Sequence, residues 1–336
     1  MIPVATRRRQ SETWQRTLRE AIRSSSTLLQ RLGLGDHPLA LQVDDAGDFG
    51  TLVPEPFLRR MRHQDPTDPL LLQVLATRQE SATLPGFSAD PLTEADYLRA
   101  PGLLQKYAGR ALLMAATSCA VNCRYCFRRH FPYTENQGAQ ALPDAVLAAL
   151  GADTTINEVI LSGGDPLMLR DNTLRTLISR LGDIPHLKTV RIHTRLPVVI
   201  PDRVTEALVE ILTGTRLRSV VVLHINHPAE IDAELGAALT RLRTSGAVLL
   251  NQSVLLKGVN DSADTLVELS ERLIASAVLP YYLHLLDPVA GAAHFDVCRS
   301  NAVALINEVR ARLPGYLVPR LVREIPGSTS KTVVVG

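Results

Sequence analysis

The sequence predicts an α/β fold, a partial barrel of six strand–helix units preceded by a helical accessory segment. Two observations support this fold class. Beyond residue 110, short apolar runs alternate with longer amphipathic stretches, and this alternation is typical of a parallel sheet covered by helices. The length of 336 residues also suits an α/β barrel, which routinely forms one unit of this size.

The first 105 residues have a different pattern. Their amphipathic periodicity predicts helices near Trp14–Leu32 and Pro69–Glu80, separated by proline-rich loops. We therefore divide the chain into a helical N-terminal accessory segment (1–105), a barrel (106–318) and a C-terminal segment (319–336).

Six apolar runs are predicted as strands, and amphipathic stretches between and after them as helices. The predicted strands are Ala111–Ala116, Glu158–Leu161, Thr189–His193, Ser219–Ile225, Ala247–Val254 and Tyr281–Leu286. The predicted helices are Pro143–Leu150, Asn172–Leu181, Pro201–Leu212, Glu230–Thr244, Ala263–Ser276 and Asn301–Leu313. A six-unit barrel and a doubly wound open sheet both fit this periodicity. In either fold, the chemistry lies in the loops after the carboxyl ends of the strands.

Composition narrows the function classes. Lys and Arg total 36 against 34 acidic residues, a formal net charge of +2, so we expect neither nucleic-acid nor membrane-surface binding. No apolar run reaches 18 residues, and the N-terminus lacks the apolar core of a signal peptide. We therefore expect a cytoplasmic enzyme.

Three of the four cysteines follow the first predicted strand with C-x3-C-x2-C spacing, at Cys119, Cys123 and Cys126. Three thiolates can hold three irons of a [4Fe–4S] cluster and leave the fourth iron open to a small molecule. The alternative is a zinc site completed by His130. Cys298 stands apart and is interpreted as an ordinary free thiol.

This spacing, with Tyr125 before the last cysteine, resembles the signature of the radical S-adenosylmethionine superfamily. The resemblance implies that S-adenosylmethionine chelates the open iron and that its reductive cleavage releases a 5′-deoxyadenosyl radical. Gly163-Gly164-Asp165, after the second predicted strand, resembles the segment of that family that contacts the methionyl amino group. A turn of this composition is also common in plain loops.

Longer segments resemble lysine 2,3-aminomutases and together extend over residues 100–332. They are CRYCFRRHF (123–131), SGGDPL (162–167), RIHTRLPVVIP (191–201), HINHPAEI (224–231), NQSVLLKGVND (251–261), YYLHLLDPVAGAAHF (281–295) and PGSTSKT (326–332). Residues 119–138, 68–70 and 84–87 resemble the shorter bacterial branch, which supplies (R)-β-lysine for modification of elongation factor P.

Migration of an amino group through a radical needs a π system that bridges two carbons, and pyridoxal phosphate supplies one. The resemblance implies that Lys331 is the lysine that forms a Schiff base with this cofactor. It also implies that Lys106 and Arg110 bind the phosphate region, and that Gln252 contacts the cofactor.

The resemblance assigns the substrate contacts too. Arg128 would pair with the substrate carboxylate, and Asp287 and Glu324 would receive the ε-ammonium of lysine. Glu324 stands where the clostridial enzymes have aspartate. Each acid alone also fits an ordinary role, Asp287 in a turn and Glu324 in a surface ion pair.

The sequence therefore predicts an isomerase that converts (S)-α-lysine to (R)-β-lysine with a [4Fe–4S] cluster, S-adenosylmethionine and pyridoxal phosphate. Expected partners are L-lysine, an electron donor such as a flavodoxin or ferredoxin, and a functional link to an elongation factor P lysine ligase. A homo-oligomer is left open. The alternatives are an aminomutase for another amino acid, such as glutamate, and a non-catalytic zinc-binding module.

Overall fold

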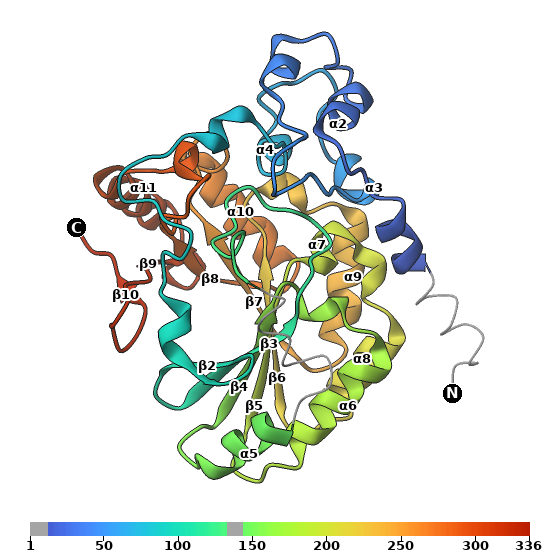
Figure 1. The fold of residues 1–336 in the computed structure, drawn as a ribbon, viewed down its shortest axis with the longest axis vertical. Helices are drawn as coiled ribbons and strands as arrows, with labels where there is room; N and C mark the ends of the chain where they lie inside the picture. Colours follow the sequence, from blue (N-terminus) through green and yellow to red (C-terminus); the bar gives the residue numbers. More distant parts are fainter. Residues whose placement is uncertain (1–12, 133–143) are drawn as a thin grey trace.

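The computed structural model describes residues 13–132 and 144–336. Its framework is one ten-stranded sheet in which the strands follow each other in chain order (Figure 1). Six parallel strands form the centre: β3 (Arg110–Ala116), β4 (Glu158–Gly163), β5 (Thr189–Thr194), β6 (Arg218–His224), β7 (Val248–Val254) and β8 (Leu279–His284). These are the six predicted strands, with bounds that differ by a few residues.

A helix follows each central strand, as predicted. The helices are α5 (Asp144–Ala152), α6 (Asp171–Gly182), α8 (Glu206–Thr213), α9 (Ala233–Arg243), α10 (Ala263–Ala275) and α11 (Arg299–Arg312). Position 143, where the first of them was predicted to begin, lies outside the described residues. Local sequence sets several starts: Thr205, Asp232 and Ser262 each accept a hydrogen bond from the backbone N–H three residues further on.

The strand order decides between the two folds that the periodicity allowed. A doubly wound sheet reverses its strand order at a switch point, whereas this order runs without reversal. Helices α6, α8 and α9 accordingly lie side by side along one face of the sheet (Figure 1). In the part of the chain that the structure describes, β1 and β10 form the two ends of an open sheet. The fold is therefore a partial barrel.

Four short strands that the sequence did not predict extend the sheet. At one end, β2 (Leu103–Tyr107) pairs antiparallel with β3, and β1 (Leu98–Ala100) pairs antiparallel with β2. At the other, β9 (Arg320–Arg323) runs parallel to β8, and β10 (Thr332–Val333) pairs antiparallel with β9. These strands matter because β9 ends next to Glu324 and β10 begins next to Lys331.

The N-terminal segment is less helical than predicted. The helix expected over 14–32 is interrupted: residues 13–19 are helical, and α2 (Ser25–Arg31) starts anew. The interruption has a local cause, because the Ser24 side chain accepts from the Thr27 N–H and Ile22 bridges to Val53. The helix expected over 69–80 is reduced to α4 (Pro69–Leu72) and a 3-10 turn at Arg78–Ser81.

The remaining helical elements are short. They are α3 (Glu55–Leu58), α7 (Leu196–Val199) and the 3-10 turns η1 (Pro38–Gln42), η3 (Glu94–Tyr97), η4 (Pro166–Met168), η5 (Pro201–Arg203), η6 (Pro228–Glu230), η7 (Ala293–Phe295) and η8 (Gly315–Leu317). None of the helices within residues 13–132 and 144–336 is long and apolar enough to cross a membrane.

Candidate active site

One cavity of about 590 Å³ runs through the interior of the partial barrel. Its size lies in the range typical of cofactor sites. Parallel strands place their carboxyl ends at one edge, so residues far apart in sequence meet there. Every residue that the sequence assigned to the aminomutase site lines this cavity: Lys106, Arg110, Cys119, Cys123, Cys126, Arg128, Gly163, Gly164, Asp165, Gln252, Asp287, Glu324 and Lys331.

The cysteine loop follows β3 and is anchored from the N-terminal segment. The guanidinium of Arg124 is buried against the carboxylate of Glu80, and the Arg124 N–H donates to the carbonyl of Gln73 at 2.9 Å. Burial raises the pKa of the Cys119 thiol well above its usual range and raises that of Cys126 to about 11. Such thiols keep their protons at neutral pH until a metal displaces them.

His130 does not join the three cysteines. Its Nε2 lies 3.2 Å from the carbonyl oxygen of Ala290, and the residue lines a separate, smaller pocket with Glu80. Across residues 13–132 and 144–336, no three His, Cys, Asp or Glu side chains are arranged around a single-ion site. A [4Fe–4S] cluster does not need that convergence, since each thiolate binds a different iron.

Gly163 and Gly164 let their own backbone lie close to that of Ala116 and Ser118. Gly163 has a φ of +116°, and a Cβ there would lie 2.3 Å from the carbonyl oxygen of Ala116. A Cβ on Gly164 would lie 2.3 Å from the carbonyl oxygen of Ser118, beside the cysteine loop. The glycines are therefore required by the chain's own backbone, whatever ligand they also face.

Asp165 organises the end of β5. Its buried carboxylate accepts hydrogen bonds from the Thr194 hydroxyl at 2.7 Å, the Arg195 N–H at 2.7 Å and the Leu196 N–H at 2.8 Å. Burial raises the pKa of Asp165, although these bonds oppose it. Asp165 thus holds the turn from which Arg195 projects.

Lysines and acids meet at another part of the cavity. Lys331 Nζ lies 2.5 Å from Glu324 Oε2, and Lys106 Nζ lies 3.2 Å from Glu324 Oε1. Burial alone would raise the pKa of Glu324, but the two ammonium groups outweigh it and lower this pKa to about 2. Glu324 is therefore an ionised bridge between two lysines and not the surface ion pair considered from the sequence.

Asp287 follows β8 in the same charged region. Burial, and then the negative charge of Glu324, raise the pKa of Asp287 to about 7. A cation placed beside Asp287 would favour its ionised form. Asp287 is therefore only partly ionised near neutral pH, and an ammonium group that binds beside it would shift it to the carboxylate form.

Arg128 has an acidic partner that the sequence did not suggest. Its Nε and Nη2 each lie 2.7 Å from an oxygen of Glu94, on the 3-10 turn η3, and its Nη1 donates to the Ser162 hydroxyl at 3.0 Å. All three side chains are buried. Glu94 thus occupies the side of the guanidinium that carries Nε, and Nη1 points toward the end of β4.

The two remaining predicted cofactor contacts lie on strands. Arg110 begins β3, and its guanidinium carbon lies 4.7 Å from the centroid of the Tyr107 ring. Gln252 lies on β7 and pairs in register with His224 and Tyr282. Both face the cavity.

Sequence reasoning assigned no role to several residues that line the cavity. Burial lowers the pKa of His193 and His284 far below the usual value, so both are neutral, and the Nε2 of each has no hydrogen-bond partner among the described residues. Arg195 Nη1 lies 2.7 Å from Cys123 Sγ. The sequence signal that could have identified Arg195 as a site residue is its position directly after β5.

Comparison with known proteins identifies the family. Residues 108–194, which carry the three cysteines, match the 4Fe-4S single cluster domain. An L-lysine 2,3-aminomutase from Haemophilus influenzae is 46% identical over 325 residues, covering 97% of this chain and 96% of the relative. One from Escherichia coli is 48% identical and covers 96% of this chain and 94% of the relative.

The chain belongs to the L-lysine 2,3-aminomutase family. This is a family of radical S-adenosylmethionine isomerases, so the fold class and the cluster signature predicted from the sequence are confirmed. A more distant member from Clostridium subterminale is 36% identical over 284 residues, covering 83% of this chain and 67% of that protein. A radical SAM methyltransferase from Sphaerobacter thermophilus superposes with a TM-score of 0.47 at 19% identity over 66% of this chain and 68% of its own.

The residues present fit the [4Fe–4S] cluster that this aminomutase family implies. Three free thiols on one loop line one cavity, and thiolate is the ligand that such clusters require. A guanidinium lies against the sulfur of Cys123, and a positive donor there suits a negatively charged cluster ligand. Cys119, Cys123 and Cys126 would hold three irons, and the fourth would be left for S-adenosylmethionine.

Proposed function

We propose that this aminomutase converts (S)-α-lysine to (R)-β-lysine, using pyridoxal phosphate in addition to its cluster and S-adenosylmethionine. The observation that carries the proposal is the position of Lys331. Its side chain lines the same cavity as the three cysteines, so an amine able to form a Schiff base and a radical-generating cluster can serve one substrate.

The residues around Lys331 fit pyridoxal phosphate. Lys106 and Arg110 line the cavity as two cations for a phosphate group, and Gln252 adds a hydrogen-bonding side chain. When bound, pyridoxal phosphate would supply the conjugated system that amino migration needs, and S-adenosylmethionine the group that removes hydrogen from carbon. The protein would hold the reacting atoms in place.

Charges of opposite sign support lysine as the substrate. Arg128 lines the cavity and would take the carboxylate, while Asp287 and Glu324 would take the ε-ammonium. Burial raises the pKa of Asp287 to about 7. A neighbouring ammonium group would stabilise the ionised form, so Asp287 suits a substrate chain that ends in a cation.

We further propose that the enzyme acts in the cytoplasm with a flavodoxin or ferredoxin as electron donor, and that its product is attached to elongation factor P by a lysine ligase. The relatives that cover nearly the whole chain support this branch of the family, because they match the N-terminal segment as well as the barrel. Residues 1–105 would then act as an accessory segment that supplies Glu94 to the cavity, Glu80 to Arg124 of the cysteine loop and Gln73 to Arg195.

A side-by-side substrate experiment tests lysine against the runner-up, glutamate. Anaerobically reconstituted enzyme is given dithionite, both cofactors and equimolar lysine and glutamate, and the β-amino acids formed are quantified. We expect β-lysine as the product, and we expect Asp287→Asn to slow its formation. Formation of β-glutamate in excess, or an Asp287→Asn variant that is fully active on lysine, would refute the assignment.

A further inference from the structure

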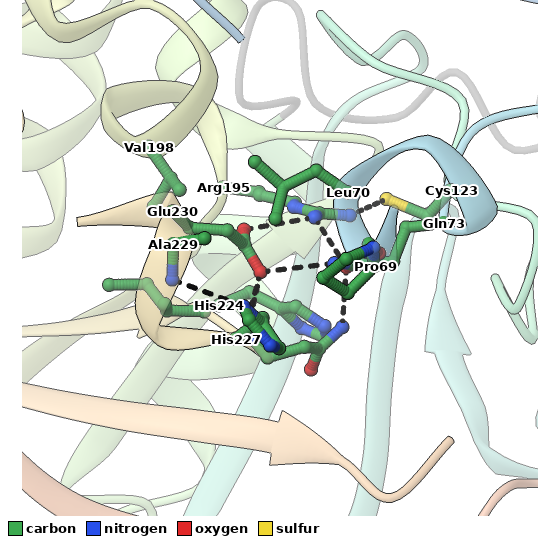
Figure 2. Close-up of polar contacts among 12 residues, drawn as sticks. Pro69, Leu70, Gln73, Cys123, Arg195, Val198, His224, His227, Ala229 and Glu230 are labelled. Carbon is green, nitrogen blue, oxygen red and sulfur yellow. Dashed lines mark hydrogen bonds and ion pairs between the residues drawn. The ribbon is translucent and has the colours of Figure 1, made fainter. Parts of the chain in front are cut away.

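Arg195 contacts one of the three candidate cluster ligands directly. Its Nη1 lies 2.7 Å from Cys123 Sγ, across 72 positions of sequence, and Figure 2 shows the guanidinium pointing at the sulfur. A guanidinium is always protonated in proteins and has no acceptor atoms, so it donates to the sulfur. The contact is thus a charge-assisted hydrogen bond to a thiolate once iron is bound.

The other end of the guanidinium is fixed by residues from two further segments. Arg195 Nη2 donates to Gln73 Oε1 at 2.7 Å and to Glu230 Oε2 at 3.0 Å. Glu230 is completely buried, and its other oxygen accepts from the Asn226 and His227 N–H groups at 2.9 and 3.0 Å. Figure 2 shows the contacts of Glu230 with Arg195 and Gln73.

The backbone of Arg195 is held as well. Its N–H donates to Asp165 at 2.7 Å, so the carboxylate that follows the paired glycines also sets the origin of the arginine side chain. With both its backbone and its Nη2 end fixed, the guanidinium keeps Nη1 directed at the cysteine loop. A flexible surface arginine would not provide a constant electrostatic field at the sulfur of Cys123.

Reduction of a [4Fe–4S] cluster adds one negative charge. A fixed cation and hydrogen-bond donor on a ligand sulfur stabilises the reduced state more than the oxidised state, and hydrogen bonds to the sulfurs are among the factors that set cluster potentials. Since Glu230 pairs with Nη2, Nη1 is the donor that faces the sulfur.

We propose that Arg195 is a positioning residue that acts on the cluster through Cys123 and raises the cluster's reduction potential. Glu230, Gln73 and Asp165 orient Arg195 for this role. This inference rests on the assignment of Cys123 as an iron ligand. It does not depend on the identity of the amino acid substrate, so it can fail or succeed separately from the lysine assignment.

The test is a potentiometric titration of the reconstituted full-length protein, followed by electron paramagnetic resonance without S-adenosylmethionine or amino acid. We expect Arg195→Gln to bind the full iron content and to shift the midpoint potential to more negative values. Arg195→Lys keeps the positive charge but loses the planar guanidinium with its several donors. Its shift in midpoint potential should therefore have the same sign and be smaller. If Arg195→Gln does not fold, the shift of Arg195→Lys decides alone.

Arg203→Lys is the matched control, because Arg203 is likewise a buried arginine but pairs with Asp171 and the carbonyl of Leu167. We expect its potential to equal that of the wild type. An unchanged potential in the Arg195 variants, or an equal shift in Arg203→Lys, would overturn the proposal. Loss of iron from both Arg195 variants would also overturn it, since Arg195 would then only support the loop.

Discussion

The ammonium nitrogen of Lys331 lies 2.5 Å from Oε2 of Glu324, and that of Lys106 lies 3.2 Å from Oε1 of the same carboxylate. Three pieces of chain are joined in this way: β2 carries Lys106, Glu324 directly follows β9, and Lys331 directly precedes β10. Glu324 therefore fixes the C-terminal segment against the wall of the cavity, and its charge contributes to stability as well as to the site.

The first prediction concerns this carboxylate. The pKa of Glu324 falls from 4.5 to about 2 on folding, so its contribution to stability is present above pH 4.5 and is lost as the pH falls toward 2. The shift corresponds to at most about 3 kcal/mol. We expect Glu324→Gln to lower the Tm of the metal-free protein at pH 7, with a smaller difference from wild type at pH 3. The exposed Glu308→Gln should change little at either pH, and an equal loss at both pH values for Glu324→Gln would contradict this origin.

The second prediction concerns Lys331. Replacing it with alanine removes the amine proposed to hold pyridoxal phosphate, and we expect activity to fall by at least about a thousandfold while iron content stays at the wild-type level. Visible absorbance of bound pyridoxal phosphate and iron analysis measure the two effects. Lys257→Ala, at an exposed lysine, should keep both. Retention of bound pyridoxal phosphate and activity in Lys331→Ala would exclude this role.

The third prediction concerns pH. Since burial and the charge of Glu324 raise the pKa of Asp287 to about 7, and a lysine ammonium binds better to its ionised form, kcat/KM for lysine should rise as the pH increases through about 7. Initial rates between pH 6 and 8.5 measure this. In Asp287→Asn this step should disappear from the profile. A profile that keeps the same rise in the variant would assign the titration to another group.

The fourth prediction separates two roles of Arg128. If its guanidinium receives the substrate carboxylate, Arg128→Lys should raise KM for lysine by roughly tenfold or more, because the fork is lost. KM for lysinamide, which has no carboxylate, should change much less. Equal changes for both compounds, at unchanged iron content, would mean that Arg128 acts only through its pair with Glu94.

The fifth prediction compares cysteines. Cys126→Ala should lose most of the bound iron and the activity, since its thiol lines the cavity with those of Cys119 and Cys123. Cys298 is exposed and lies 3.2 Å from the Ser300 hydroxyl, so Cys298→Ala should keep both. Iron analysis and the spectrum of the reconstituted proteins distinguish these cases. Full iron content in Cys126→Ala would rule out its assignment as a ligand.

The sequence predicted the repeated part of this structure best. Strands β3, β4 and β6 are mostly apolar, whereas β5 and β7 mix apolar with polar residues; their regular alternation with amphipathic helices is the pattern that the sequence shows clearly. The strand β10 has two residues and β9 has four, too few for a periodic signal. The interruption near Ser24 was missed because it depends on a bridge to Val53, which periodicity does not reveal.

The same contrast holds for the site. The cysteine spacing and Lys331 carry their own chemical meaning, so they could be proposed from the chain alone. The residues that contact these site side chains could not be predicted from the chain alone. Glu94 lies 34 residues before Arg128, and Arg195 is an ordinary basic residue until the fold brings it to Cys123. Contacts of this kind are set by strand order and register.

The most direct test of the central claim is a single-substrate turnover experiment. Reconstituted enzyme with full iron and pyridoxal phosphate content is incubated anaerobically with S-adenosylmethionine, dithionite and (S)-lysine carrying ¹⁵N only at the α-amino group. We predict (R)-β-lysine with ¹⁵N at the β-amino group, because the nitrogen migrates within one molecule. Absence of β-lysine from enzyme that still cleaves S-adenosylmethionine would contradict the account.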